Sequence, residues 1–249
     1  MLRHASKIIG CDVVSSDGSV GKVHDILFDE VSWTFQHLVA DIGSWLAGER
    51  VLLPLAAVGE VDEVERQLQV HLTKGEIEHC PGVSTCTTAS EEAQVLLGKY
   101  WMWTTTSFAH LPPEASRVMD SEATADEKEE VEDKVESRLR SVRESDGYHI
   151  AAPDGDIGHL TELVVDSDTW QIQYLVVNTG NWLLRRNVLI PRAALESIHW
   201  ADRKVHLSIT KNEIKNSPEY DPKEMLDRDY EQTLHDHYGH RPYWQEPNP

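Results

Sequence analysis

The chain repeats itself at a constant offset of 137 residues, and this internal repeat limits the possible folds more than any other feature. Without a gap, about 23 of 72 aligned pairs between residues 10–81 and 147–218 are identical. The matches include turn glycines, tryptophans and a proline: Asp17-Gly18 with Asp154-Gly155, Gly21 with Gly158, Trp33 with Trp170, Trp45 with Trp182, and Pro54 with Pro191. Identity at a fixed spacing marks a duplicated structural unit. The sequence therefore predicts two copies of one small domain.

Each copy has the pattern of short strands separated by turns. Asp17-Gly18 and Pro153-Asp154-Gly155 are hairpin signals. Short apolar runs, such as Leu38–Ile42 and Val51–Leu53, end at a glycine or a proline, as buried strands do. Five or six such strands per copy favour a small barrel over a sandwich. We expect a mainly β fold, with two tandem barrels joined by a charged helical linker, each followed by a short helical and aromatic tail.

A capping box closes both copies at equivalent positions. Thr73 stands three residues before Glu76, and Thr210 stands three residues before Glu213. In this pattern the threonine hydroxyl accepts a backbone N–H while the glutamate accepts the N–H of the threonine. A proline follows each pattern within two turns, so we expect two short helices.

Helices are also predicted between and after the copies. Residues 114–145 hold eleven acidic and six basic side chains, and four apolar residues recur at helical spacing within 122–143: Val131, Val135, Leu139 and Val142. We interpret this as a solvated linker helix, with a coiled-coil contact as the alternative. In the tail, Asp221-Pro222 is typical of a helix start and Gly239 of a helix end, before Tyr243-Trp244.

These patterns divide the chain into four segments. Residues 1–82 form the first barrel, and residues 83–145 form its tail and the charged linker. Residues 146–218 form the second barrel, and residues 219–249 form the C-terminal helix with its Tyr-Trp tail.

The net charge of −20 restricts the choice of partners. Nucleic-acid binding needs clustered Lys and Arg, so we expect no nucleic acid. Residues 1–7 contain no apolar region of the length typical of a signal peptide, and no apolar stretch reaches about 18 residues, so we expect no direct membrane insertion. Three cysteines without a Cys-x-x-Cys pair fit a reducing compartment, which predicts a cytoplasmic protein.

The order of these motifs resembles the PRC-barrel domain, twice over. The first copy reads Asp17-Gly18-x-x-Gly21-x-Val23, then Phe28-Asp29, Leu38-Val39 and Leu52-Leu53-Pro54. The second reads Asp154-Gly155-x-x-Gly158, then Val165-Asp166, Leu175–Val177 and Leu189-Ile190-Pro191. The tail from Ser217 to Trp244 is similar to that of stand-alone bacterial members. The resemblance covers about two-thirds of the chain by the repeat boundaries. It implies an all-β barrel used for protein contacts, with no catalytic residues to transfer.

No catalytic motif contradicts that expectation. The chain has no Gly-x-Ser-x-Gly, no P-loop and no His-Glu-x-x-His, so we expect a protein that is not an enzyme and uses no cofactor. Cys11 falls in an apolar strand, where a buried structural thiol is the ordinary outcome. We also expect Asp29 and Asp166 to cap turns.

Four aromatic residues are candidates for binding a partner: Trp45, Trp182, Tyr243 and Trp244. Trp45 and Trp182 begin equivalent loops, and tryptophan is common in binding hot spots. Packing against the chain's own barrels is the alternative. His237 and His240 lie three apart at the end of the tail helix and are candidate metal ligands. A helix C-terminus also favours histidine without any metal.

The sequence thus predicts a scaffold or adaptor that acts by protein–protein contacts through the duplicated barrels. The partner is a protein that the sequence does not identify, and self-association into a homodimer is a further expectation. The alternative is a sensor that binds a small ligand or a metal, through the tail histidines or through the groove between the barrels.

Overall fold

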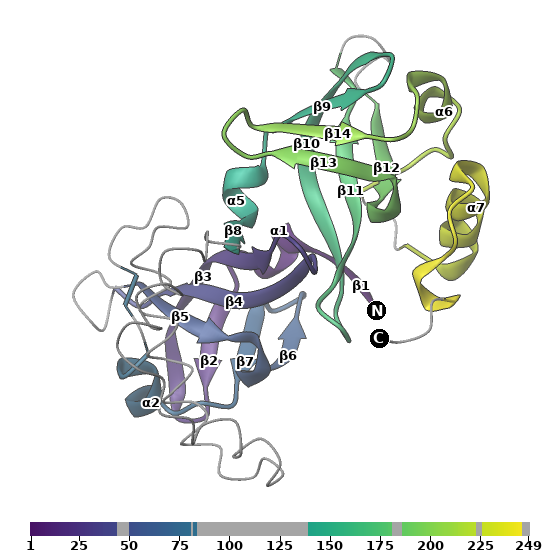
Figure 1. Ribbon diagram of the computed structural model, residues 1–249. Coiled ribbons are helices and arrows are strands. Elements are labelled where there is room, and N and C mark those ends of the chain that lie inside the picture. The colour runs from purple at the N-terminus through teal and green to yellow at the C-terminus, as the bar shows by residue number, and fades with distance from the viewer. Residues whose placement is uncertain (44–49, 81, 84–138, 181–185, 223–225, 246–249) are drawn as a thin grey trace, which may run out of the picture.

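The two copies form two separate seven-stranded sheets in the computed structural model (Figure 1). The structure describes residues 1–43, 50–80, 82–83, 139–180, 186–222 and 226–245. The elements of the first copy are β1 Leu2–His4, α1 Ala5–Ile8, β2 Asp12–Ser15, β3 Gly18–Asp29, β4 Thr34–Asp41, β5 Arg50–Pro54, η1 Leu55–Ala57, β6 Val58–Asp62, β7 Gln67–Val70 and α2 Lys74–Glu78. Those of the second are β8 Leu139–Ser141, α5 Val142–Ser145, β9 His149–Ala152, β10 Gly155–Asp166, β11 Ile172–Asn178, β12 Asn187–Pro191, η4 Arg192–Ala194, β13 Leu195–His199, β14 Lys204–Leu207 and α6 Lys211–Lys215. The tail adds α7 Arg228–Tyr238 and η5 Tyr243–Gln245.

Both sheets have the same topology. The order is β5-β4-β3-β2-β7-β6 in barrel 1 and β12-β11-β10-β9-β14-β13 in barrel 2. Neighbours pair antiparallel, except β2 with β7 and β9 with β14, which pair parallel. The repeated Gly21 and Gly158 lie where the long strand crosses the end of its neighbour. A Cβ atom would stand 2.0 Å from the Asp41 carbonyl oxygen at Gly21, and 1.9 Å from that of Asn178 at Gly158. Only glycine permits this close approach.

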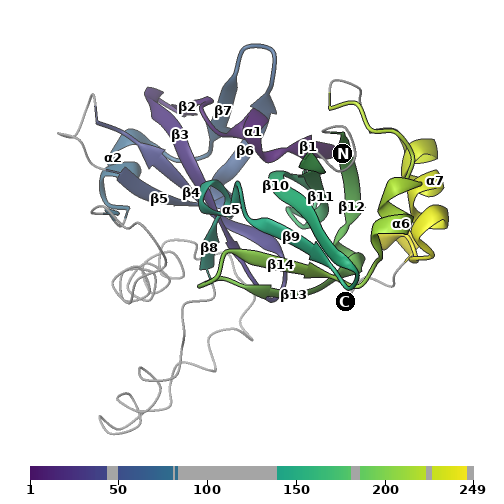
Figure 2. The same ribbon diagram turned by 90° about the horizontal axis from the view of Figure 1, so that it is seen from above.

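The first strand of each copy is exchanged between the barrels. Strand β1 pairs with β10 of barrel 2, with Leu2 opposite Asp166 and His4 opposite Val164. Strand β8 pairs with β3 of barrel 1, with Leu139 opposite Asp29. Figure 2 shows the two barrels side by side, with β1 lying against barrel 2 and β8 against barrel 1. Each barrel is therefore completed by a strand that the other copy supplies.

The hairpin tips at Trp33 and Trp170 make a second reciprocal contact. The Phe35 N–H donates to the Trp170 carbonyl at 2.8 Å, and the Ile172 N–H donates to the Trp33 carbonyl at 2.7 Å. Both tryptophans have a φ of 57°, which a large side chain seldom adopts. The two halves are thus related by an approximate twofold axis that passes between these tips.

The two barrels share one hydrophobic core. A single cluster of buried side chains runs through both barrels and includes Leu234 and Tyr238 of α7. At the junction Trp200 of barrel 2 packs on Phe28 of barrel 1, with ring centroids 6.1 Å apart, and on Tyr148 at 5.8 Å. Because the core is continuous, the barrels are held by direct packing and by strand exchange as well as by the chain that connects them.

Several sequence predictions are confirmed. Both capping boxes are present, at Thr73–Glu76 and at Thr210–Glu213. Asp29 caps its turn by accepting the Val31 and Ser32 N–H groups, and Asp166 accepts the N–H of Asp168. Gly239 ends α7 in the left-handed region, with a φ of 67°.

Two helix predictions need correction. The linker helix was predicted to extend through residue 143. Instead, Leu139–Ser141 form strand β8, and Val142 begins the short helix α5. The remainder of that prediction, and the tail after barrel 1, lie outside the described residues. The tail helix starts later than Asp221-Pro222 predicts, since Asp227 is the N-cap and accepts the Tyr230 N–H at 2.8 Å.

Candidate functional site

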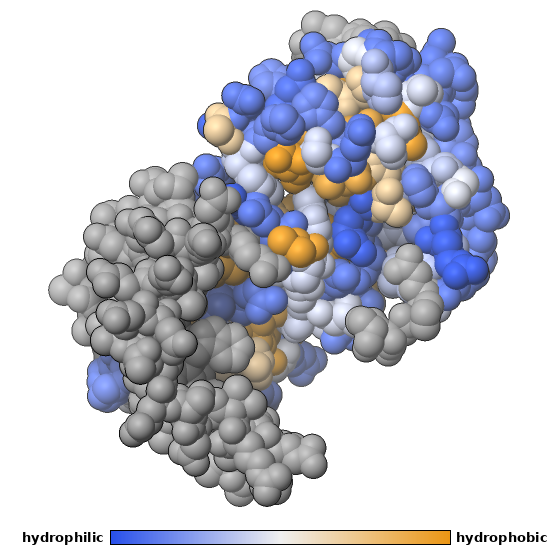
Figure 3. Space-filling view, viewed as in Figure 1, coloured by the Kyte–Doolittle hydropathy of each residue, from blue (hydrophilic) through white to orange (hydrophobic). Residues whose placement is uncertain are grey.

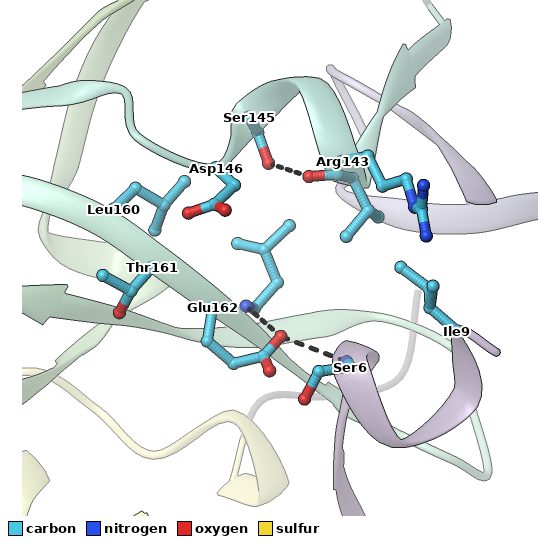
Figure 4. Close-up of a pocket in the computed structure, with 10 residues that line it drawn as sticks. Ser6, Ile9, Arg143, Ser145, Asp146, Leu160, Thr161 and Glu162 are labelled. Atoms are coloured by element: carbon cyan, nitrogen blue, oxygen red, sulfur yellow. Dashed lines mark hydrogen bonds between the residues drawn. The ribbon is translucent and has the colours of Figure 1, made fainter. Parts of the chain in front are cut away.

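A groove of about 450 Å³ lies where the two barrels meet, beside α1 and α5 (Figure 4). Its apolar lining comes from both copies: Ile9, Val142, Leu160 and Leu163. Figure 3 shows apolar side chains at the surface near this junction, with hydrophilic ones around them. Small-molecule sites generally have this size and a partly apolar wall. The groove is therefore the first candidate site.

Strand exchange builds the groove, because an acid of each barrel holds the helical turn of the other copy. Asp25 of β3 accepts the Arg143 N–H at 3.1 Å and the Ser141 hydroxyl. Glu162 of β10, at the equivalent position, accepts the Ser6 N–H at 3.3 Å. A register shift just before each acid interrupts the strand ladder. Such bulges re-aim side chains, here toward the other copy.

The two sides of the groove differ chemically. Copy 2 contributes Arg143 and Asp146, while the equivalent residues of copy 1 are Ser6 and Ile9. The Arg143 guanidinium makes no hydrogen bond or ion pair with any residue that the structure describes. Figure 4 shows the Asp146 and Glu162 carboxylates facing the groove. One cationic group, two carboxylates and an apolar floor suit a small zwitterion or the end of an extended peptide.

A second polar cluster lies under the tail helix. The Tyr174 hydroxyl of β11 donates to Glu231 at 2.9 Å and lies 2.9 Å from Nε2 of His235. All three side chains are buried. Burial raises the pKa of the Glu231 carboxyl above its usual range. Burial and the nearby Glu231 raise the pKa of Tyr174. This cluster fastens α7 to barrel 2, because a buried polar group needs its partners.

The aromatic candidates at the end of the tail contact the chain itself. The Arg228 guanidinium lies 4.0 Å from the Trp244 ring centroid and 5.6 Å from that of Tyr243. Trp244 also packs on His235 at 5.3 Å, and Tyr243 on Tyr174 at 6.4 Å. Both aromatic side chains remain half-buried, so part of each ring faces solvent. Trp45 and Trp182, the other two candidates, lie outside the described residues.

The structure does not bring the candidate metal ligands of the tail into a ligand cluster. Nε2 of His237 lies 2.8 Å from the Glu213 carbonyl oxygen, so this ring is tied to α6. Nε2 of His240 is buried without a hydrogen-bond partner in the described part of the chain. Across the described ranges, no three His, Cys, Asp or Glu side chains gather to hold a metal ion. Cys11 is buried, as predicted, and burial raises the pKa of its thiol.

Sequence reasoning missed the residues that build both clusters. The predicted linker included Arg143, Asp146 was the first residue of the predicted second barrel, and Tyr174 was assigned only as one of several strand residues. The signal for Asp25 and Glu162 was their equivalence in the repeat, where an acid recurs at an otherwise apolar stretch of the long strand. Because no spacing links residue 6 to residue 162, the groove itself left no pattern in the sequence.

A family model matches the chain twice, and together the matches cover more than half of it. The PRC-barrel domain model matches residues 2–77 and residues 150–213. The chain belongs to the PRC-barrel family. Both matches coincide with the observed repeats, so the resemblance inferred from the motifs is confirmed. PRC-barrel domains are generally non-catalytic.

No curated protein matches this PRC-barrel chain. None of the helices in the described ranges has both the length and the apolar character that a membrane crossing requires.

Proposed function

We propose that this PRC-barrel protein is a non-catalytic adaptor that binds a protein partner through equivalent surfaces of its two barrels. The observation that carries the proposal is the reciprocal exchange of β1 and β8, together with the continuous core. Two equivalent surfaces that are held in one orientation give a bivalent contact, in which the second binding event is intramolecular. Rigid presentation also lowers the entropy cost of binding.

The contact surface is proposed to include the two equivalent loops between β4 and β5 and between β11 and β12, which carry Trp45 and Trp182. The strands that flank them pair in the same register, Asp41 with Arg50 and Asn178 with Asn187. The loops therefore start and end at equivalent points on the two barrels. Tryptophan supplies a large contact area for one side chain.

The charge and the cysteines support the remaining parts of the proposal. A net charge of −20 favours a partner with a basic surface over a nucleic acid. Cys11 is a free buried thiol, which fits a cytoplasmic location. Self-association into a homodimer belongs to the same proposal, and sedimentation equilibrium measures it directly.

The test is an affinity capture from the native host lysate, followed by binding measurements on the purified partner. The variants are Trp45→Ala, Trp182→Ala and the double variant, with Val64→Ser as a control for an exposed apolar side chain elsewhere. Bivalent binding predicts that each single variant weakens binding by about 10-fold or more, and that the double variant loses far more. Equal binding by the double variant and the wild type, with both folded, would refute the proposed surface.

A ligand sensor is the second candidate, and the groove between the barrels is the observation that favours it. The chemistry of its wall predicts binding of free amino acids or short peptides. A thermal-shift screen with these compounds tests this function. Arg143→Ala should abolish any shift, whereas Arg140→Ala, on the neighbouring β8, should leave it unchanged. A ligand shift that Arg143→Ala does not affect would place the binding elsewhere.

A further inference from the structure

Four histidines lie on neighbouring strands of barrel 2. They are His159 on β10, His149 on β9, His206 on β14 and His199 on β13. The register places His149 opposite His159 and beside Lys204, which in turn lies opposite His199. These four strands run side by side (Figure 1). The flanking Ile150 and Val205 are buried in the core, whereas His149 and His159 are exposed, so the histidines belong to the outer face.

The histidines form two cross-strand pairs. The ring centroids of His149 and His159 are 4.7 Å apart, and those of His199 and His206 are 5.2 Å apart. With a metal–nitrogen bond of about 2.1 Å and tetrahedral geometry, two imidazoles on one ion have their centroids roughly 5 Å apart. Both pairs therefore already have nearly the spacing that a shared metal ion requires.

The fold does not need these histidines, because barrel 1 is built without them. The equivalents of His149 and His159 are Asp12 and Lys22, which form an ion pair at 2.7 Å. The equivalents of His199 and His206 are Asp62 and Gln69. At the position where barrel 1 pairs Asp12 with Lys22, barrel 2 pairs two identical imidazoles. Two imidazoles do not attract one another by charge, but a cation that both coordinate joins them.

The charges on this face are compatible with a cation. An Asp202 carboxylate oxygen lies 3.9 Å from Nδ1 of His199. The Lys204 ammonium lies 3.9 Å from the Asp156 carboxylate, which offsets its positive charge between the two pairs. The side chains of Asp202 and His199 are 76% and 58% exposed, so an ion from solvent reaches them freely.

We propose that the outer face of barrel 2 binds divalent transition metals, one ion at His149–His159 and one at His199–His206. Two imidazole nitrogens and water complete each coordination sphere, and imidazole suits Zn²⁺, Cu²⁺ and Ni²⁺. With two protein ligands, each site is weaker than a structural zinc site with four. These sites differ from the tail pair, where His237 is tied to α6.

Titration calorimetry with Ni²⁺ and with Zn²⁺ on the metal-free full chain at pH 7.5 tests the proposal. The variants are His149→Gln/His159→Gln, His199→Gln/His206→Gln and, as the matched control, His237→Gln/His240→Gln. Each barrel pair variant should lose one bound ion relative to the wild type, and the tail variant should lose none. Circular dichroism establishes that every variant folds, which the exposed positions favour.

A wild type that binds neither metal would overturn the proposal. So would wild-type stoichiometry in both barrel pair variants. Loss of bound metal only in the tail variant would assign the ions to His237 and His240 instead.

Discussion

His37 in barrel 1 offers a sharp quantitative test of the packing described above. It is 5% exposed, and its Nδ1 has no hydrogen-bond partner in the described ranges. Burial lowers the pKa of His37 from 6.5 to about 4. The unfolded chain therefore binds one more proton than the folded chain between these two pH values. The stability that neutral His37 contributes is complete above pH 6.5 and is lost as the pH falls toward 4.

The size of the effect follows from the shift. A difference of about 2.5 pKa units corresponds to about 3 kcal/mol of unfolding free energy. Urea denaturation of the wild type and of His37→Leu, followed from pH 7.5 to pH 4, measures it. Subtracting the unfolding free energies of the two proteins at each pH removes the contribution of other groups with a lowered pKa, such as His4. The difference should change by about 3 kcal/mol in favour of the variant as the pH falls. The exposed His71→Gln is the control. A difference that does not vary with pH would refute the reasoning.

Four further changes test other contacts. Gly158→Ala should destabilise the chain by about 2 kcal/mol or more in urea unfolding, because its Cβ would meet the Asn178 carbonyl, whereas Gly75→Ala, where nothing lies within 4 Å, should not. Thr210→Ala should lower the free energy of unfolding by about 1 kcal/mol, as measured by thermal unfolding. Thr73→Ala should lower it by the same amount, because both capping boxes make the same contacts. Tyr174→Phe should release the tail to limited proteolysis sooner, because Glu231 and His235 lose the Tyr174 hydroxyl as a hydrogen-bond partner. Glu231→Gln should gain stability relative to the wild type as the pH rises above 4.5, because the folded pKa of Glu231 is raised and the wild type loses stability when the carboxyl ionises.

Much of the local structure was predictable because it rests on short-range chemistry. A capping box involves residues three apart, so Thr210 and Glu213 could be read directly. Asp29 caps the turn that follows it, and Gly239 ends a helix through its own φ. The duplication supported the predictions of the capping boxes and the turn caps, because each of these patterns occurs in both copies.

The exchange of strands was not predictable from the sequence. Leu2–His4 and Leu139–Ser141 are three-residue strands, too short for a period of two to appear. Their partners lie more than 100 residues away in the chain, and nothing in their composition says which barrel they complete. Leu139 and Val142 fitted a helical spacing, and tertiary pairing overrode it.

The candidate sites could not be predicted either, because they also depend on which strands pair with one another. His237 and His240 were candidate metal ligands because they lie three residues apart on a predicted helix. The cross-strand histidine pairs of barrel 2 are instead separated by ten and seven residues, a spacing that indicates no metal site in the sequence. Cross-strand neighbours depend on register, which the hairpin and the β-bulges set. The groove depends on the contact between two copies, so it required the assembled fold.

The exchange links the architecture to the proposed function. If each barrel is completed by the other copy, the two equivalent surfaces stay in a fixed relation, as bivalent binding requires. The same contact forms the groove at the junction. Loss of the exchange would therefore weaken both the adaptor and the ligand-binding hypothesis.

Hydrogen–deuterium exchange on a variant that lacks residues 1–4 tests this central claim most directly. In the intact chain, β1 pairs with residues 164–166, and the Ser167 N–H donates to the Met1 carbonyl at 2.8 Å. The structure predicts that the Ser167 amide of barrel 2, which donates to Met1, loses protection, whereas the Asp166 amide, which donates to Gln171, and strands β4 and β5 of barrel 1 keep theirs. Unchanged protection at Ser167, or a loss confined to barrel 1, would contradict the exchange.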